Sequence, residues 1–496
     1  MKREQAWREQ NGQTHMPLYD KLEQYGNSDY YPYHMPGHKR KKCGSLPEQI
    51  LKADITEIDG FDNLHEAAGV LRAAQETANA LYGSEETFFL VNGSTAGILS
   101  AISAVVSEKG HLLIVRNSHK SVYHAAYLRH LRLSYLYPAV NEMFGFGEAV
   151  TPEAVRAVLD SEPDIEAVLI VTPTYEGRIA NVKEIAESVH AKGIPLIVDE
   201  AHGAHLGFAE GFAESSCTAG ADIVIHSVHK TLPAMTQTAL LHINGKRVDR
   251  ERVKRFLRIY QTSSPSYVLM ASICDAMEFL KKNAADAFAV FRRQYMQMLE
   301  DLKACRELCF PSADDIVSGV QDIGKLIIGT KTGMRGQWLY DTLREKYHLQ
   351  CEMAAGKYCL AMFTVADGAE AYERMTQALL EIDALLNESC FRSGQCQIAV
   401  SQQRTEQSLA VKQGEIRVPF CEAWDSEWNL KHFSEAVGCA VGEFINLYPP
   451  GTPILVPGEI LTEELYDRIR SYQEQNLNLQ GLVKKEGEDF IKVLEY

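Results

Sequence analysis

Short runs of apolar residues alternate with longer stretches of mixed apolar and polar residues between about positions 85 and 245. This alternation predicts a mainly parallel sheet whose strands are joined by crossover helices. The apolar runs place the strands at Thr87–Val91, Leu112–Val115, Ala167–Val171, Pro195–Val198, Ile223–Ile225 and Ala239–Ile243. Because ligands of such sheets bind at the carboxyl ends of the strands, candidate chemistry is expected there.

The pattern changes beyond position 250. Residues Arg252–Leu302 have a helical pattern, and strands near Lys325–Gly329 and Tyr358–Thr364 indicate a second, smaller domain. Residues 391–415 are rich in Gln and Ser and predict an exposed connection. We therefore expect an N-terminal segment (1–65), a large domain (66–285), a small α/β domain (286–390) and a C-terminal domain (391–496).

Composition narrows the class of protein. The chain has 496 residues, of which 46% are hydrophobic and 23% charged, as is typical of soluble globular proteins. It has neither a run of roughly 18 apolar residues nor an apolar leader, so we expect a cytoplasmic protein that does not bind membranes. A net charge of −16 disfavours nucleic acid as a partner. Eleven cysteines without a Cys-x-x-Cys pair indicate reduced thiols.

Two strand ends carry the chemistry of a cofactor pocket. Lys230 follows the apolar run at Ile223–Ile225, where a desolvated amine loses its charge easily and becomes a nucleophile. Such an amine holds pyridoxal phosphate (PLP) as a Schiff base. Asp199 ends the run at Pro195–Val198, and a carboxylate there keeps the pyridine nitrogen protonated, so that the ring accepts the electrons released at the substrate Cα. Together Lys230 and Asp199 predict a PLP pocket.

Two further motifs agree with this pocket, although each is weak alone. The segment Asn92–Gly97 joins a predicted strand to a predicted helix, and its glycines, Ser94 and Thr95 suit a phosphate. His119 follows the strand at Leu112–Val115, where an imidazole can stack on a pyridine ring. Alternatively, Asn92–Gly97 is a plain turn, and His119 caps a helix or packs in the core.

Parts of this pattern also occur in two other types of site. Asp199-Glu200-Ala201-His202 also matches the Mg²⁺-binding element of helicases, but an NTPase needs an earlier phosphate loop. The nearest match, Gly319–Leu326, comes later and has Leu326 where Ser or Thr is required, so the NTPase is rejected. Asp199, His202 and His205 have the ligand chemistry of a metal site, but the sequence has no His-Glu-x-x-His helix. No metal is therefore expected.

The chain resembles the Orn/Lys/Arg decarboxylase family over nearly its whole length. The resemblance implies an α/β fold of the fold type I (aspartate aminotransferase-like) class, in the short form without an N-terminal wing domain. One departure is Cys439, which stands where many members have Arg. The matching segments, in the family's order, are Tyr33–Lys39, Asp54–His65, Asn117–Ser121, Pro173–Gly177, Asp199–Gly203, Ser227–Lys230, Thr262–Tyr267, Glu443, Tyr448–Pro453 and Pro457–Glu459.

The resemblance also implies roles for single residues. Lys230 would carry PLP, Asp199 would pair with its ring nitrogen, and His119 would stack on the ring. His202 would bind the phenolic oxygen or the substrate carboxylate. The phosphate would be bound by Ser94, Thr95, Ser227 and His229, with Thr262 and Ser263 from the neighbouring subunit, so that the active unit is a homodimer.

The expected reaction is decarboxylation of a basic amino acid, arginine or lysine before ornithine, to CO₂ and a polyamine-related amine. Lys230 or His229 would protonate Cα, and Glu443 or Asp62 would bind the distal cation. An aminotransferase of the same fold is the alternative, but the sequence offers no assignable cation for the substrate carboxylate. A non-enzymatic binding protein would be expected to lose Lys230 or Asp199, and both are present.

Overall fold

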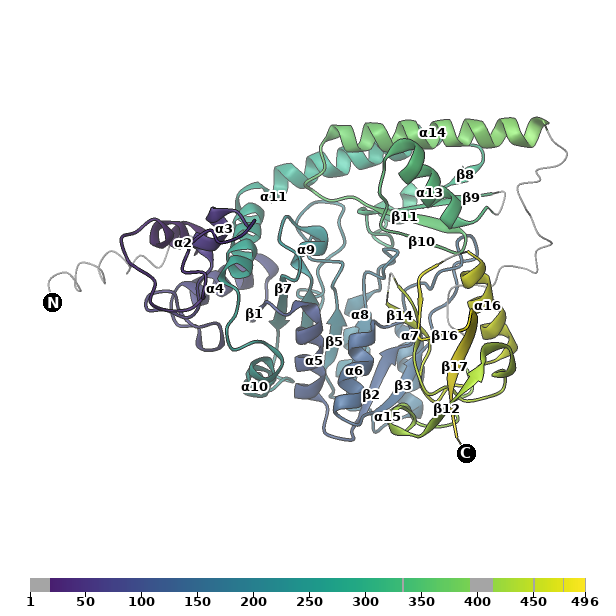
Figure 1. The fold of residues 1–496 in the computed structure, drawn as a ribbon, viewed down its shortest axis with the longest axis horizontal. Coiled ribbons are helices and arrows are strands. Elements are labelled where there is room, and N and C mark those ends of the chain that lie inside the picture. The colour runs from purple at the N-terminus through teal and green to yellow at the C-terminus, as the bar shows by residue number, and fades with distance from the viewer. Residues whose placement is uncertain (1–17, 332–333, 393–413, 449–450, 476, 496) are drawn as a thin grey trace.

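The structure is a computed structural model that describes residues 18–331, 334–392, 414–448, 451–475 and 477–495. Most of the predicted connection 391–415 lies outside these ranges. Figure 1 shows the N-terminal helices at the left, the large sheet in the centre, the small sheet with two long helices above it, and the C-terminal elements in yellow at the lower right.

The large sheet has seven strands in the order β1-β7-β6-β5-β4-β2-β3. Strand β7 runs antiparallel to both of its neighbours, and every other neighbouring pair is parallel. The six predicted strands are present, each displaced by at most one residue at either end, and the unpredicted β3 forms an edge. The strands are β1 (Glu86–Leu90), β2 (His111–Val115), β3 (Arg132–Leu136), β4 (Ala167–Val171), β5 (Leu196–Asp199), β6 (Ile223–His226) and β7 (Ala239–Ile243).

Alternate strand residues pack into two different cores because successive side chains point to opposite faces. On β2, Leu112 and Ile114 pack with helices α5 (Gly93–Val105), α6 (Lys120–Leu128) and α10 (Arg250–Tyr260). The neighbouring Leu113 and Val115 belong to the core of the other face. That core includes helices α4 (Val70–Tyr82), α7 (Pro152–Ser161) and α8 (Val182–His190). Burial on both faces explains the unbroken apolar runs in the sequence.

A four-stranded antiparallel sheet follows, in the order β10-β11-β9-β8. The predicted helical region is two helices, because Pro265 breaks it and Ser266 caps the second helix by accepting from the Leu269 N–H. The predicted boundary at 285 falls inside that second helix. The elements are α11 (Tyr267–Leu302), β8 (Leu308–Cys309), α12 (Ala313–Val317), β9 (Lys325–Thr330), α13 (Gly336–Tyr347), β10 (Met353–Ala355), β11 (Tyr358–Met362) and α14 (Ala369–Arg392).

The C-terminal elements form two small sheets, β12-β17-β16 and β14-β13-β15. Helix α15 packs against α6 and β3, so this part covers the β3 edge of the large sheet. Cys439 accepts a contact from Lys431 Nζ at 3.4 Å. The elements are α15 (Phe420–Asp425), β12 (Trp428–His432), η2 (Phe433–Glu435), β13 (Ile445–Leu447), β14 (Thr452–Leu455), α16 (Glu463–Glu474), β15 (Leu479–Gln480), β16 (Val483–Lys485) and β17 (Glu488–Leu494).

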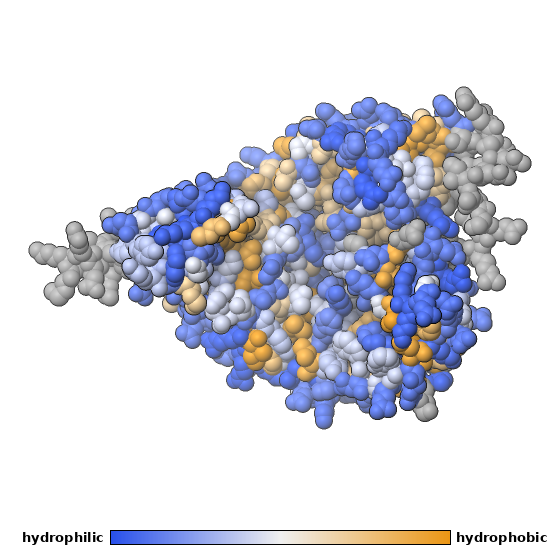
Figure 2. Space-filling model, in the orientation of Figure 1, coloured by the Kyte–Doolittle hydropathy of each residue, from blue (hydrophilic) through white to orange (hydrophobic). Residues whose placement is uncertain are grey.

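The N-terminal part packs on α11 through α2 (Leu18–Gly26) and α3 (Glu48–Ala53), and η1 (Leu64–Glu66) follows. Leu18 and Leu22 are fully enclosed there. Figure 2 shows a mostly hydrophilic face, with apolar patches beside these helices. Within the described ranges, no helix is both long and apolar enough to cross a membrane.

Candidate active site

The predicted cofactor residues gather at one edge of the large sheet. Asp199 is the last residue of β5, and Lys230 lies in the short helix α9 (Val228–Thr231), just after β6. His119 follows β2, and Ser94 follows β1, which runs parallel to β6 because β7 is antiparallel to both. The carboxyl ends of these strands therefore bring together residues from four separate segments of the chain.

Lys230 lies beside His202, whose Nε2 is 3.1 Å from Lys230 Nζ. Burial lowers the pKa of the Lys230 amine below its usual value, and the carboxylates of Asp199 and Glu352 oppose part of this shift. A lowered pKa favours the neutral amine, which is the nucleophilic form.

Asp199 is 4% exposed, and its Oδ1 accepts a hydrogen bond of 3.1 Å from the Ala201 N–H. Burial raises the pKa of this carboxyl, while the positive charge of Lys230 lowers it. Behind it a buried polar chain crosses the sheet, in which Glu200 Oε2 lies 2.6 Å from His226 Nε2, and His226 Nδ1 lies 3.0 Å from His242 Nε2. The Asp199 carboxylate itself is buried and held by the Ala201 N–H, which suits a partner for a ring N–H.

His119 caps α6, because its Nδ1 accepts from the Ser121 N–H at 3.2 Å and from the Ser121 hydroxyl at 2.9 Å. Burial and the nearby Lys230 lower the pKa of the imidazole to about 4, so the ring is neutral near pH 7. Gly451 lies against this ring, since a Cβ built there would be 3.5 Å from His119 Nε2. The C-terminal part therefore reaches the site.

The residues predicted to bind the phosphate lie on the segments that follow β1 and β6. The Ser227 hydroxyl is buried and has no hydrogen-bond partner among the described residues, as expected of a group that awaits an acceptor. Ser94 and Thr95 lie in the first turn of α5, whose backbone N–H groups and dipole favour an anion. His229 Nδ1 donates to the Thr238 carbonyl at 2.9 Å, so the hydrogen of the neutral ring is on Nδ1. Nε2 therefore donates to a phosphate only when the ring is protonated.

These observations fit PLP. The site contains a partly desolvated amine, a buried carboxylate, a neutral ring and an unpartnered hydroxyl at a helix start. When bound, PLP would be held by Lys230, Asp199 and His119 and by the hydroxyls of Ser227 and Ser94.

Thr262 lies next to the phosphate segment of its own chain, since its N–H donates to Asn92 Oδ1 at 3.3 Å. Thr262 and Ser263 are exposed, and the Thr262 carbonyl lies 2.9 Å from His65 Nε2. Their expected contact with a neighbouring subunit stays a prediction.

Three residues that sequence reasoning did not assign to the site also belong to it. Lys325, the first residue of β9, places its Nζ 2.7 Å from His202 Nδ1. Tyr175, from the loop after β4, packs its ring edge on His202 with the ring centroids 4.8 Å apart. The third residue is Glu352, which accepts a hydrogen bond from the Tyr175 hydroxyl. The signal for Lys325 was present, because a lysine beginning an otherwise apolar strand is unusual in a core.

The two predicted tail-binding carboxylates have other partners. Asp62 accepts hydrogen bonds from five backbone N–H groups, including that of Gly69 at 2.7 Å, and thereby caps α4. Glu443 pairs with Lys492 on β17, with 3.1 Å between Oε2 and Nζ. The structure does not bring either carboxylate into contact with Lys230, and their role in binding substrate stays a prediction.

Comparisons with known proteins agree with this geometry. The model of the Orn/Lys/Arg decarboxylase major domain matches residues 16–349. The arginine decarboxylase of Halalkalibacterium halodurans is 31% identical over 95% of this chain and 96% of that protein. The uncharacterized protein YaaO of Bacillus subtilis is 33% identical over 97% of this chain and 98% of that protein. A lysine decarboxylase of Pseudomonas aeruginosa and an ornithine decarboxylase of Escherichia coli match over 52% of this chain.

This chain belongs to the Orn/Lys/Arg decarboxylase family. Among solved structures, the lysine decarboxylase LdcF of Francisella novicida superimposes with a TM-score of 0.81 at 17% identity, covering 97% of this chain and 81% of that one. The fold type I class and the decarboxylase assignment predicted from the sequence are thereby confirmed.

Proposed function

We propose that the protein is a PLP-dependent arginine decarboxylase that releases CO₂ and the corresponding amine. The observation that carries this proposal is the convergence of the Lys230 amine, the Asp199 carboxylate and the neutral His119 ring at one edge of the sheet. Arginine is preferred to lysine and ornithine because relatives named arginine decarboxylase match nearly the full chain, whereas those named for lysine or ornithine match about half.

When bound, PLP accepts the electron pair released as the bond from Cα to the carboxylate breaks. The chain's own residues would do the rest. Asp199 would hold a proton on the ring nitrogen, and His119 would fix the ring plane. Lys230, whose pKa is lowered by burial, would deliver the proton that Cα receives after CO₂ leaves. His202 would hold Lys230 in place through Nε2.

The distal guanidinium of arginine needs a carboxylate, and we propose Glu352 for this role. Its charge acts on Lys230, and its side chain contacts Tyr175, which packs on His202. Glu352 is exposed in the described chain, whereas the predicted Glu443 and Asp62 are already paired with Lys492 and with backbone N–H groups.

We further propose a homodimer as the active unit. Thr262 and Ser263 are exposed beside the phosphate segment, so they are available to a second subunit. Tyr30, Tyr31 and Tyr33 form an exposed aromatic run, and Tyr33 is 90% exposed. Exposed aromatic clusters of this kind are typical of protein interfaces. Sedimentation equilibrium on the purified protein tests the proposal, and a monomer at micromolar concentration would contradict it.

The function itself is tested with purified protein, PLP and each of arginine, lysine and ornithine in turn, with CO₂ and amine measured together. Equal amounts of both products, greatest with arginine, are expected. Keto acid in place of CO₂ would favour the aminotransferase.

A further inference from the structure

The two ring nitrogens of His202 each contact one lysine amine. Lys230 Nζ lies 3.1 Å from Nε2, and Lys325 Nζ lies 2.7 Å from Nδ1. His202 is 6% exposed and Lys325 is 1% exposed. The three groups form one line of hydrogen bonds that joins the loop after β5, helix α9 and the first residue of β9.

The protons in this line are constrained by simple valence. A neutral imidazole has one N–H and one lone pair, so it donates to one lysine and accepts from the other. The lysine that receives the imidazole N–H must offer a lone pair and is therefore a neutral amine. Burial, together with Lys230 and Lys325 on either side, holds the pKa of His202 well below its usual value, so the imidazole is neutral. At most one of the two lysines is then an ammonium.

The surroundings favour Lys325 as the donor. Its contact with His202 is the shorter of the two, as expected of a charge-assisted bond. It lies over the Tyr175 ring, with 5.4 Å from Nζ to the centroid. Three carboxylates act on Lys325: Asp322 from its own loop, Glu352 from beside β10, and Glu176 from the loop after β4. The amine of Lys230 opposes them. The three carboxylates offset part of the effect of burial, which is the largest influence on the Lys325 pKa and lowers it.

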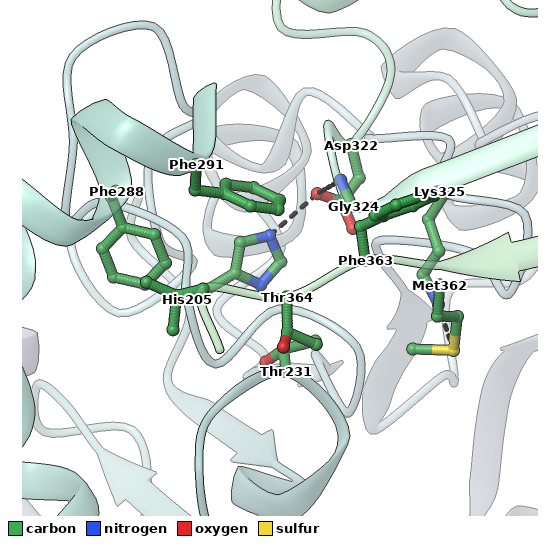
Figure 3. Close-up of a pocket in the computed structure, with 11 residues that line it drawn as sticks. His205, Thr231, Phe288, Phe291, Asp322, Gly324, Lys325, Met362, Phe363 and Thr364 are labelled. Atoms are coloured by element: carbon green, nitrogen blue, oxygen red, sulfur yellow. Dashed lines mark hydrogen bonds and ion pairs between the residues drawn. The ribbon is translucent and has the colours of Figure 1, made fainter. Parts of the chain in front are cut away.

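Figure 3 shows a small cavity of about 10 Å³ beside Lys325, which is lined by Phe288, Phe291, Met362 and Phe363 as well as by His205, Thr231 and Asp322. His205 Nε2 donates to Asp322 Oδ1 at 2.8 Å, which fixes that carboxylate in place. The Thr231 hydroxyl and His205 Nδ1 are buried and have no partner among the described residues. A cavity of this size holds about one water molecule when polar groups line it. Most of the cavity lining is nevertheless apolar, which agrees with the lowering of the Lys325 pKa by burial.

We propose that Lys325 is a positioning residue that sets the protonation state of Lys230 through His202. With Lys325 donating to Nδ1, the Nε2–H of His202 points at Lys230 and holds it as the neutral amine. Transfer of one proton from Lys325 to Nδ1, together with transfer of the Nε2 proton to Lys230, makes Lys230 an ammonium and Lys325 a neutral amine. No proton is gained or lost: the positive charge moves from Lys325 to Lys230, and His202 changes from the Nε2–H to the Nδ1–H tautomer.

This role rests on the proposed function, in which Lys230 needs both states. The neutral amine attacks and accepts a proton, and the ammonium supplies the proton that Cα receives after CO₂ leaves. Burial and the neighbouring Lys230 lower the pKa of Lys325 to about 8, although Asp322 opposes the shift, so it can release its proton near neutral pH.

The test compares Lys325→Met with the control Lys331→Met, a lysine just beyond the other end of β9 whose Nζ donates only to the Arg306 carbonyl among the described contacts. PLP-free protein is pulse-labelled with acetic anhydride across a pH series, and the labelling of Lys230 is read by peptide mass spectrometry. Loss of the Lys325 charge should raise the midpoint of Lys230 labelling by about one pH unit or more, since a nearby like charge lowers an amine pKa by about that much. Lys331→Met should leave it unchanged.

The loaded enzyme gives a second measurement. Lys325→Met should lower kcat by about tenfold or more while KM for arginine stays near that of the wild type, and the limb of the pH profile near 8 should disappear. If Lys325→Met does not fold, Lys325→Gln carries the same expectations. An unshifted Lys230 midpoint in a folded variant overturns the proposal. So does a large rise in KM with kcat unchanged, because that would make Lys325 a ligand of the substrate carboxylate. The labelling requires no turnover, so it stands apart from any failure of the proposed function.

Discussion

Arg116 donates two hydrogen bonds to Glu459, from Nε at 2.9 Å and from Nη2 at 2.7 Å, although both side chains are buried. Arg116 follows β2 of the large sheet, and Glu459 lies in the C-terminal part. The guanidinium also donates to the carbonyls of Pro453 and Ile454. Burial disfavours the charge of Arg116, but the pKa of the guanidinium is raised overall because Glu459 lies against it. This ion pair holds the C-terminal part where Gly451 contacts His119.

Removing one partner of this pair should destabilise the protein strongly. Glu459→Gln leaves a buried guanidinium without its counter-charge, which typically costs about 3–5 kcal/mol. Urea unfolding of Glu459→Gln, Arg116→Met and the double variant measures the effect. The double variant should lose less than the sum of the two single variants, and full additivity would show that the pair does not act as a unit.

Lys230→Ala should abolish the covalent link to PLP. The wild-type protein is expected to be yellow, with a visible band that sodium borohydride bleaches, because reduction fixes the cofactor on the lysine amine. Peptide mapping after reduction should place the pyridoxyl group on Lys230. Its appearance on Lys325 instead would exchange the roles of the two amines.

Asp199→Asn should retain PLP but lose turnover by about 10²-fold or more. A neutral amide cannot hold a proton on the ring nitrogen, so the electron pair left by CO₂ is poorly stabilised. Cofactor content is measured by absorbance and turnover by amine release. Activity close to wild type would contradict this role for the carboxylate.

Lys325→Met should stabilise the folded protein at neutral pH. The pKa of Lys325 is about 8 in the folded chain and 10.5 in an exposed lysine, so below pH 8 folding carries the cost of a buried ammonium. That cost shrinks as pH rises from 8 to 10.5 and is absent above this range. The variant should therefore gain about 1–3 kcal/mol at pH 7 and nothing near pH 11. Urea unfolding at both pH values checks the sign, with Lys331→Met as control.

Glu352→Gln should lower kcat/KM for arginine by about one to two decades, the value of a charge-assisted hydrogen bond.

Asp62→Asn should instead lower the unfolding free energy, because it weakens the cap of α4. Glu443→Gln should change the ratios among arginine, lysine and ornithine only if Glu443 leaves Lys492 to bind substrate. Steady-state kinetics on the three amino acids tests Glu352→Gln and Glu443→Gln, and urea unfolding tests Asp62→Asn.

The strands of the large sheet were predictable because their residues are buried on both faces. Strand β3 was missed because it is an edge strand with Arg132 exposed, so its sequence lacks a continuous apolar run. The strand-end residues Lys230, Asp199 and His119 were predictable for the same reason as the strands, since a polar residue that ends an apolar run must lie at the sheet edge.

The contacts between parts of the chain were not predictable. Lys325 and His202 are 123 positions apart, and nothing in either segment alone indicates that they meet. The sequence placed Lys325 at the start of a predicted strand and in a rejected phosphate loop, Gly319–Leu326, but gave no sign of its contact with His202. Asp62 looked available because its five backbone partners depend on how the chain turns into α4.

The position of Glu459 also has a consequence for how the protein is made. It is 343 positions after Arg116, and at about 5–20 residues per second a ribosome needs roughly 17–70 s to cover that interval. During that time the sheet around β2 can form, but Glu459, whose carboxylate pairs with the Arg116 guanidinium, has not yet been synthesised. The nascent chain must keep this corner in water until translation is almost complete. Arg116 can therefore be buried with its partner only after most of the last tenth of the polypeptide has been synthesised.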